Sequence, residues 1–141
     1  MSGKIDFYEN HSEILTDKVF EVGEIYFIKD GLLAMPESDR KAQRKIHKGR
    51  PVVVVQNNSG NSNPINPIIT VAPISSVTKY KKPNDIPLTP KEDNVNKDSL
   101  LLLSLIQPIL KVDLERCIGS ISDEKLKQAL YIIGGRFGII D

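Results

Sequence analysis

Along most of the 141-residue chain, hydrophobic and polar positions follow the pattern of β-strands. Val22–Lys29 alternates and is rich in β-branched and aromatic residues, which predicts a strand. The continuous β-branched run Pro51–Gln56 predicts a strand buried on both faces, and therefore a central one, with Pro51 at its first position. Shorter apolar runs predict further strands at 68–73, 86–88, 99–105, 106–112 and 116–118.

Helical spacing appears after these strands. Ser122 is a favourable N-cap, and Asp123 and Glu124 fall in the first turn, where negative charge suits the helix dipole. An apolar face follows at helical spacing, and Gly134 and Gly135 are expected to end or interrupt the helix: Leu126, Ala129, Leu130 and Ile133 form this face. Strands followed by one helix predict a mainly β fold, a small barrel-like sheet capped by a C-terminal helix.

The remaining segments indicate a single domain with an N-terminal extension and an internal insertion. Residues 1–18 are polar and weakly patterned, so we interpret them as an N-terminal extension to a single domain at 19–141. A long polar insertion at 31–49 interrupts this domain, with a short helix expected from Pro36 to Ile46. Turn-forming residues fill Asn57–Pro67. Long loops in small domains are often functional.

Composition narrows the class of protein. Hydrophobic residues make up 40% and charged residues 26%, as in a soluble globular protein. The apolar runs are too short to cross a membrane, and the charged first 20 residues exclude a signal peptide, so we expect a cytoplasmic protein without a membrane partner. One cysteine, Cys117, rules out an intrachain disulfide, and we expect it in the core. Two histidines and one cysteine cannot build a Cys/His zinc site, and no acidic cluster suggests magnesium, so no metal or cofactor is expected.

The net charge of +1 hides a basic stripe. Between Arg40 and Asn84 there is no Asp or Glu, while nine Lys and Arg side chains fall in the same window. Such a stripe suits a polyanion such as RNA, although a solvated basic loop has the same pattern.

Four stretches, in order, resemble the MazF/PemK family of toxins over about residues 20–140. They are Val22-Gly-Glu-Ile-Tyr-Phe-Ile28, Lys48-Gly-Arg-Pro-Val-Val-Val-Val55, Val71-Ala-Pro-Ile-Ser-Ser76, and the pair that begins at Lys97-Asp-Ser-Leu and Ile118-Gly-Ser-Ile-Ser-Asp123. The resemblance implies an SH3-like barrel of the CcdB/PemK type. It also implies a homodimer and a cognate antitoxin as partner. The implied activity is a metal-independent endoribonuclease that cuts single-stranded RNA at specific sequences by 2′-OH attack, leaving a 2′,3′-cyclic phosphate and a 5′-OH.

The resemblance also implies the catalytic residues. The family arginine matches Arg50, whose guanidinium fork can hold two phosphoryl oxygens. The family threonine matches Ser75, and its neighbour Ser76 is the alternative. Serine keeps the hydroxyl of threonine, which can donate a hydrogen bond to a phosphoryl oxygen. His47 is a further candidate from its ordinary pKa near 6.5, which suits acid–base work.

Several other residues are candidate RNA contacts. Basic side chains near the motif would bind phosphates without reading sequence, and polar side chains at strand ends would contact bases. These candidates are Arg44, Lys45, Lys48, Gln56, Asn57, Ser76 and Gln107. Gln107 stands where the family has a basic residue, and Ser104–Pro108 lacks the charge that some relatives use there.

Two alternatives remain open at this level. A CcdB-like gyrase-binding toxin would share the fold without the nuclease chemistry. A degenerate family member would bind RNA or an antitoxin without cutting, which the uncharged Ser104–Pro108 segment favours.

Overall fold

A computed structural model describes residues 19–36 and 49–139, and its sheet confirms the predicted mainly β fold. All strand pairs are antiparallel, and the order along the sheet is β4-β5-β3-β2-β1-β7, with β6 paired to β3 off this path. The strands are β1 (Glu24–Ile28), β2 (Arg50–Val54), β3 (Ile68–Ser75), β4 (Asp85–Leu88), β5 (Ser99–Leu102), β6 (Gln107–Leu110) and β7 (Cys117–Ser120).

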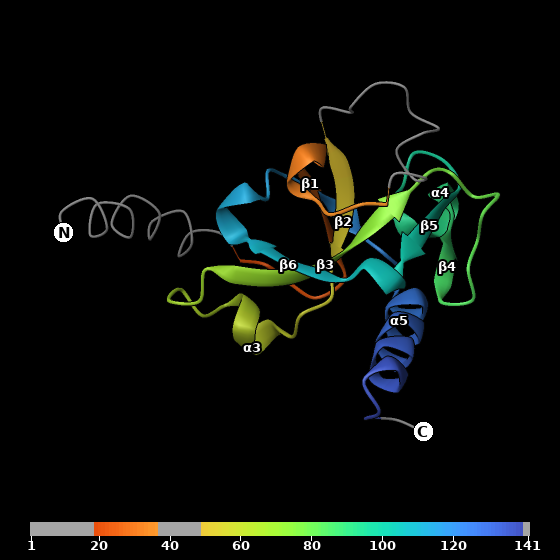
Figure 1. The fold of residues 1–141 in the computed structure, drawn as a ribbon. Helices are drawn as coiled ribbons and strands as arrows, with labels where there is room; N and C mark the ends of the chain where they lie inside the picture. Colours follow the sequence, from red (N-terminus) through yellow and green to blue (C-terminus); the bar gives the residue numbers. More distant parts are fainter. Residues whose placement is uncertain (1–18, 37–48, 140–141) are drawn as a thin grey trace.

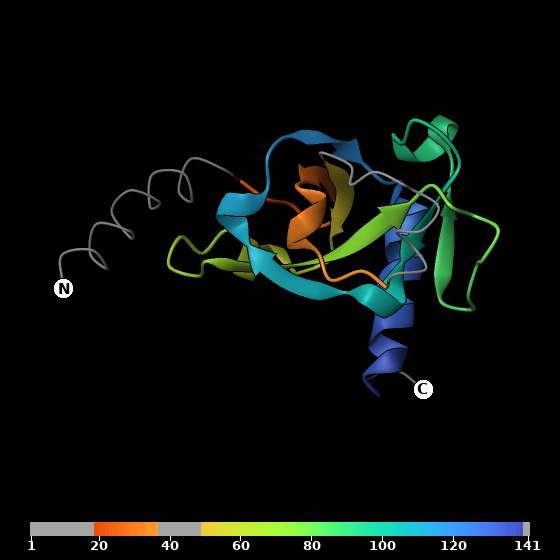
Figure 2. The same cartoon turned by 45° about the horizontal axis from the view of Figure 1, so that its top comes forward.

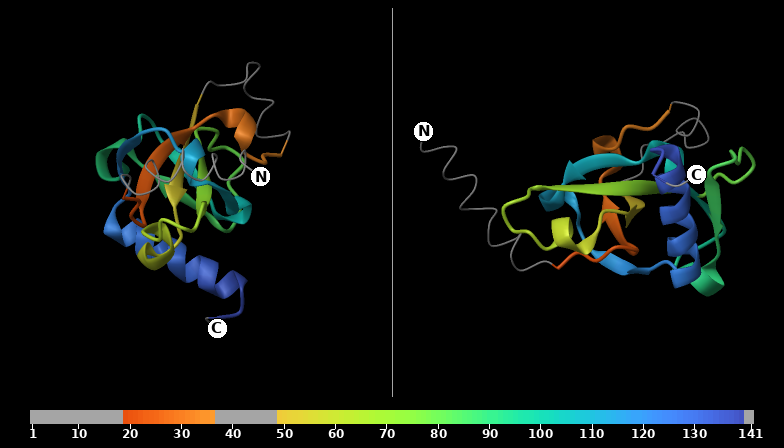
Figure 3. Two further views of the ribbon diagram at one scale, coloured as in Figure 1. Left: turned by 90° about the vertical axis from the view of Figure 1, so that its left-hand side faces the viewer. Right: turned by 90° about the horizontal axis from the view of Figure 1, so that it is seen from below.

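The long strand β3 organises the sheet. One edge of β3 pairs with β2, while the other edge pairs first with β6 and then, at Ile74 and Ser75, with β5. A short 3-10 turn, η2 (Leu103–Leu105), carries the chain between β5 and β6. Because two strands share this edge, the sheet curls around itself, as the end-on view shows (Figures 1 and 3).

Alternation along β2 divides the apolar core between the two faces of the sheet. Val52 and Val54 pack with Phe20, Ile28 and Ile69 on one face. On the other face, Val53 packs in a second cluster with Ala72, Leu101 and Ala129. The three valines have no exposed surface, which confirms the prediction of a central strand buried on both faces. Arg50, not Pro51, begins this strand, and Pro51 precedes the first residue paired with β3.

The predicted terminal helix is α5 (Asp123–Arg136), which packs on the second core cluster and projects beyond the sheet (Figures 1 and 2). Ser122 caps it as predicted, accepting a hydrogen bond from the Lys125 amide. The expectation that Gly134 and Gly135 end or interrupt the helix is wrong. The helix continues through both glycines to Arg136. Beyond it, Gly138 has φ of +73°, and the amides of Gly138 and Ile139 donate to the carbonyls of Gly135 and Gly134.

Other elements differ in detail from the expectations. The turn segment Asn57–Pro67 contains a short helix, α3 (Asn58–Asn61), and a second, α4 (Pro90–Asp93), precedes β5. The strands predicted at 99–105 and 106–112 end earlier, at η2 and at the 3-10 turn η3 (Lys111–Asp113). The insertion begins with the 3-10 turn η1 (Asp30–Leu32) and a buried Leu33, while 37–48 lie outside the described residues.

Cys117 is exposed, so its prediction as a core residue is wrong. The strand β7 that carries it lies at one edge of the sheet, where alternation does not ensure burial. Partial desolvation by neighbouring groups nevertheless raises the pKa of the thiol, and the nearby Glu24 carboxylate reinforces the shift. In the part of the chain that the structure describes, no helix is long and apolar enough to cross a membrane.

Candidate functional site

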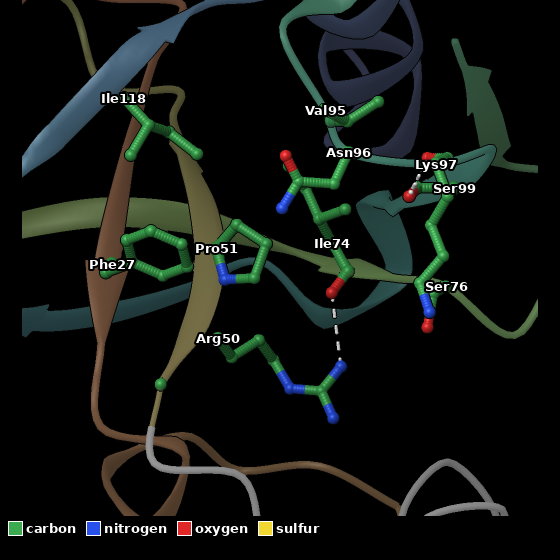
Figure 4. Close-up of a pocket in the computed structure, with 11 residues that line it drawn as sticks. Phe27, Arg50, Pro51, Ile74, Ser76, Val95, Asn96, Lys97, Ser99 and Ile118 are labelled. Carbon is green, nitrogen blue, oxygen red and sulfur yellow. Dashed lines mark hydrogen bonds between the residues drawn. The ribbon is translucent and has the colours of Figure 1, made fainter. Parts of the chain in front are cut away.

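A pocket of about 250 Å³ lies where the start of β2, the end of β3 and the segment before β5 meet (Figure 4). One part of its lining is apolar, formed by Phe27, Pro51, Ile74, Val95 and Ile118. The other part carries hydrogen-bonding and charged groups, from Gly49, Arg50, Ser76, Asn96, Lys97 and Ser99. A ligand with a flat apolar face and a polar or anionic edge fits such a lining.

Arg50 reaches this pocket from the first position of β2, and it is buried. Its Nε donates to Oδ1 of Asp30 at 2.8 Å, within an ion pair whose side chains are 4% and 2% exposed. Its Nη1 donates to the carbonyl of Ile74 at 3.1 Å (Figure 4). These bonds fix the plane of the guanidinium relative to β2 and β3, so Arg50 is a rigid cation and not a mobile surface charge.

The two neighbouring serines have different positions. Ser75 is buried within β3, does not line the pocket, and its Oγ accepts a hydrogen bond from the Val77 amide at 3.1 Å. Ser76 follows the strand, is exposed and lines the pocket. The structure therefore brings the hydroxyl of Ser76, and not that of Ser75, into the same pocket as Arg50.

Asn96 and Lys97 are pocket residues that the sequence did not identify. Both side chains are exposed, and among the described residues neither has a hydrogen-bond or ion-pair partner within the protein. Their backbone is held on both sides: Asn94 Nδ2 donates to the Ser120 carbonyl at 2.6 Å, and Ser99 Oγ donates to the Lys97 carbonyl at 2.7 Å. The sequence signal for this segment is Lys97-Asp-Ser-Leu, one of the stretches that resemble the family.

Phe27 provides the aromatic surface of the pocket. Its ring lies beside Pro51 in Figure 4, and the two residues are paired across β1 and β2. The guanidinium of Arg116 sits over the ring, 4.6 Å from its centroid. This cation–π contact restricts the ring and adds positive charge near the pocket.

Three of the remaining predicted residues, Gln56, Asn57 and Gln107, do not line this pocket. Gln56 accepts hydrogen bonds from Thr70, and Asn57 caps α3. Gln107 is bonded to the backbone of Ala34 and Leu105, so it ties β6 to the segment after η1. The basic candidates Arg44, Lys45 and Lys48, together with His47, lie outside the described residues. No three Asp, Glu, His or Cys side chains within 19–36 and 49–139 are grouped to hold a metal ion.

The curled sheet, the terminal helix and the positively charged pocket define a small β-toxin fold of the CcdB/PemK type. The model of the PemK-like, MazF-like toxins of type II toxin–antitoxin systems matches residues 21–133, and the chain belongs to this family. A curated relative, Endoribonuclease MazF of Staphylococcus saprophyticus, is 34% identical over 91 residues, covering 64% of this chain and 74% of that protein.

Solved structures agree on the fold. The Mycobacterium tuberculosis toxin MazF-mt6 has a TM-score of 0.58 at 22% identity, covering 84% of this chain and 98% of that one. A MazE-MazF structure from Deinococcus radiodurans has a TM-score of 0.62 at 16% identity, covering 87% and 99%. The predicted family and fold are thereby confirmed.

Proposed function

We propose that this toxin is an endoribonuclease that cuts single-stranded RNA at the pocket between β2, β3 and β5, without a metal ion. The observation that carries the proposal is the meeting of a rigid arginine, an exposed hydroxyl and an exposed lysine in one pocket, through Arg50, Ser76 and Lys97. A relative at 34% identity bears the name endoribonuclease, which supports the same activity here.

The chemistry needs no group beyond those that RNA and the protein supply. The 2′-oxygen attacks the adjacent phosphorus as its proton is removed, and the 5′-oxygen leaves as it gains a proton. The products are a 2′,3′-cyclic phosphate and a 5′-OH. Negative charge on the phosphoryl oxygens rises in the transition state, so fixed donors aimed at these oxygens lower the barrier.

Each pocket residue has a proposed role. Arg50 stabilises the phosphoryl oxygens, because its orientation is set before substrate binds. Ser76 donates a hydrogen bond to the same phosphate, the role that the sequence assigned to Ser75 or Ser76. Lys97 supplies a second positive charge that neutralises the phosphate. His47 remains a candidate acid or base.

The partners and location follow the family. An acidic antitoxin segment is the proposed inhibitor, since it would compete with RNA for the positively charged pocket. A structural relative from mycobacteria is named as an endoribonuclease in complex with its cognate antitoxin. We also propose a homodimer in the cytoplasm. Its interface would bury apolar side chains that are exposed on α5, such as Leu130 and Tyr131. Sedimentation at the monomer mass would contradict the dimer.

The test is cleavage of a long, defined single-stranded RNA in excess EDTA, with mapping of the ends. The wild type is expected to give discrete cuts with 5′-OH ends, and Ser76→Ala and Lys97→Ala to lower the cleavage rate about 100-fold. Arg50→Ala is expected to abolish it, but this variant also removes the buried ion pair between Arg50 and Asp30. The two exposed variants therefore carry the test, and Lys127→Ala on α5 is the matched lysine control.

Intact RNA with the wild type would contradict the nuclease. It would favour the gyrase-binding or non-cutting alternatives, which share the fold. Equal cleavage by the wild type, Ser76→Ala and Lys97→Ala would show that the active site lies outside this pocket. Thermal unfolding of every variant separates lost chemistry from lost folding.

A further inference from the structure

We propose that the pocket binds one unpaired nucleobase of the RNA and that Asn96 reads the hydrogen-bonding edge of this base. The inference rests on the proposed nuclease and adds a specificity-determining residue to it. Asn96 has no role in the proposed phosphate chemistry.

The shape and chemistry of the lining fit a base. Phe27 and Pro51 form a flat apolar wall, and Ile74 and Ile118 extend it. Bases splayed out of single-stranded RNA are commonly held on aromatic side chains, and such stacking contributes whatever the sequence. The wall therefore supplies affinity, and discrimination has to come from a polar group at its edge.

Asn96 is the polar group placed for this task. In Figure 4 its amide is turned over the pocket, in the direction of Pro51 and Ile118. The amide presents a donor beside an acceptor, which matches the paired groups on a base edge. No described residue of the protein forms a hydrogen bond with this amide.

The segment that carries Asn96 is more rigid than an ordinary loop. Asn94 adopts the left-handed conformation, with φ of 58°, and its side chain is tied to the Ser120 carbonyl. Asp93, which precedes it, is fully buried and accepts hydrogen bonds from the amides of Thr89 and Ser122. An anchored backbone fixes the position from which the Asn96 side chain extends, which lowers the entropy cost of holding its amide against a base.

Lys97 and Arg50 complete the subsite. Both line the same pocket as Phe27. When a base stacks on Phe27, these two cations therefore lie close to the phosphates of the same nucleotide and can bind them. The base read by Asn96 is therefore expected within one or two nucleotides of the cut.

The experiment uses an RNA pool with random sequence, cut by the wild type, Asn96→Ala and Asn96→Asp, followed by sequencing at the new 5′-OH ends. Asn96→Ala is expected to lose base preference at one position of the motif, with the cognate base falling about 10-fold to 100-fold relative to the others. Asn96→Asp, which only accepts hydrogen bonds, is expected to shift that position toward bases with an exocyclic amino group.

Two controls make the result decisive. Asn84→Ala removes an asparagine outside the pocket whose side chain forms no hydrogen bond among the described residues, and it should leave the motif unchanged. The same pool is also sorted by binding, so a protein that binds without cutting still reports on Asn96.

The two proposals fail in different ways. If the wild type cuts no RNA, the nuclease proposal fails, and the bound pool alone decides the role of Asn96. If cutting selects a motif that Asn96→Ala leaves unchanged, the base subsite is wrong while the nuclease stands. An unchanged motif in the bound pool alone likewise contradicts the subsite. A loss of preference at one position in either readout supports the subsite.

Discussion

The guanidinium of Arg50 lies inside the protein, opposite the carboxylate of Asp30. A charge in the interior is costly unless a partner and hydrogen bonds compensate it. Here Asp30 provides the partner charge, and the Ile74 carbonyl provides a further acceptor. The same contacts that orient the arginine for its proposed role therefore also stabilise the fold.

Asp30→Ala is expected to lower the free energy of unfolding by about 3–5 kcal/mol, because it removes the carboxylate that forms the ion pair with the buried Arg50 guanidinium. Urea unfolding measures this loss. The double variant Asp30→Leu with Arg50→Met is expected to be more stable than Asp30→Ala, since it removes both charges. A single variant as stable as the wild type would show that the ion pair does not contribute to stability.

At the scale of residues, the sequence predicted Arg50 as a candidate site residue but did not predict its ion-pair partner, Asp30. Its place in the Gly-Arg-Pro motif led to the prediction, whereas Asp30 is 20 residues away and is brought near only by pairing of β1 with β2. Ser75 and Ser76 could not be separated, because a shift of one residue along a strand changes which face a side chain occupies. Asn96 and Lys97 reach the pocket only through the way α4 is anchored.

At the scale of elements, Asp93 joins two helices. It belongs to α4, yet its carboxylate accepts hydrogen bonds from the Ser122 amide at the start of α5 and from Nζ of Lys125. Burial by itself would raise the pKa of Asp93, but the amides of Ser122 and Thr89, together with Lys125, outweigh burial and lower the pKa below 3.8. The ionised carboxylate is thus the form that the fold requires.

This linkage makes stability depend on pH. A carboxyl group whose pKa is lower in the folded state stabilises the fold above its unfolded pKa, near 4, and loses this contribution as pH falls through the folded value. Asp93→Asn is therefore expected to be less stable than the wild type at pH 7 by about 2 kcal/mol. The difference should shrink below pH 4, as measured by urea unfolding at several pH values. A constant difference would mean that the shape of the side chain, and not its charge, matters.

The elements show what pattern can and cannot predict. The buried strand β2 and the helix α5 were predicted because a continuous β-branched run and helical spacing each extend over several residues. The helix was predicted too short, since glycine is a weak helix former but does not stop a helix that is packed, and Gly134 is buried. The short elements α3, α4 and the 3-10 turns have too few residues to show any period.

At the scale of the whole molecule, charge decides how RNA approaches. Arg50 is compensated by Asp30, so its charge is partly cancelled at a distance. Lys97 is exposed, and no carboxylate among the described residues is paired with it. The basic window between Arg40 and Asn84 adds further positive charge along the sequence. We expect Lys97, more than Arg50, to supply the salt-dependent part of RNA affinity in the described pocket.

The salt-dependent part of the affinity is measured with a short RNA whose scissile nucleotide lacks the 2′-OH. This RNA can be bound but not cut, so binding is observed without cleavage. The logarithm of affinity should fall linearly with the logarithm of salt concentration, and Lys97→Ala should reduce the slope by about 0.7, the value for one phosphate contact on a single strand. Lys127→Ala should leave the slope unchanged, because Lys127 lies outside the pocket. If Lys97→Ala weakens binding without changing the slope, Lys97 contacts a base and not a phosphate. A slope changed equally by both variants would mean that RNA senses only the net charge of the protein.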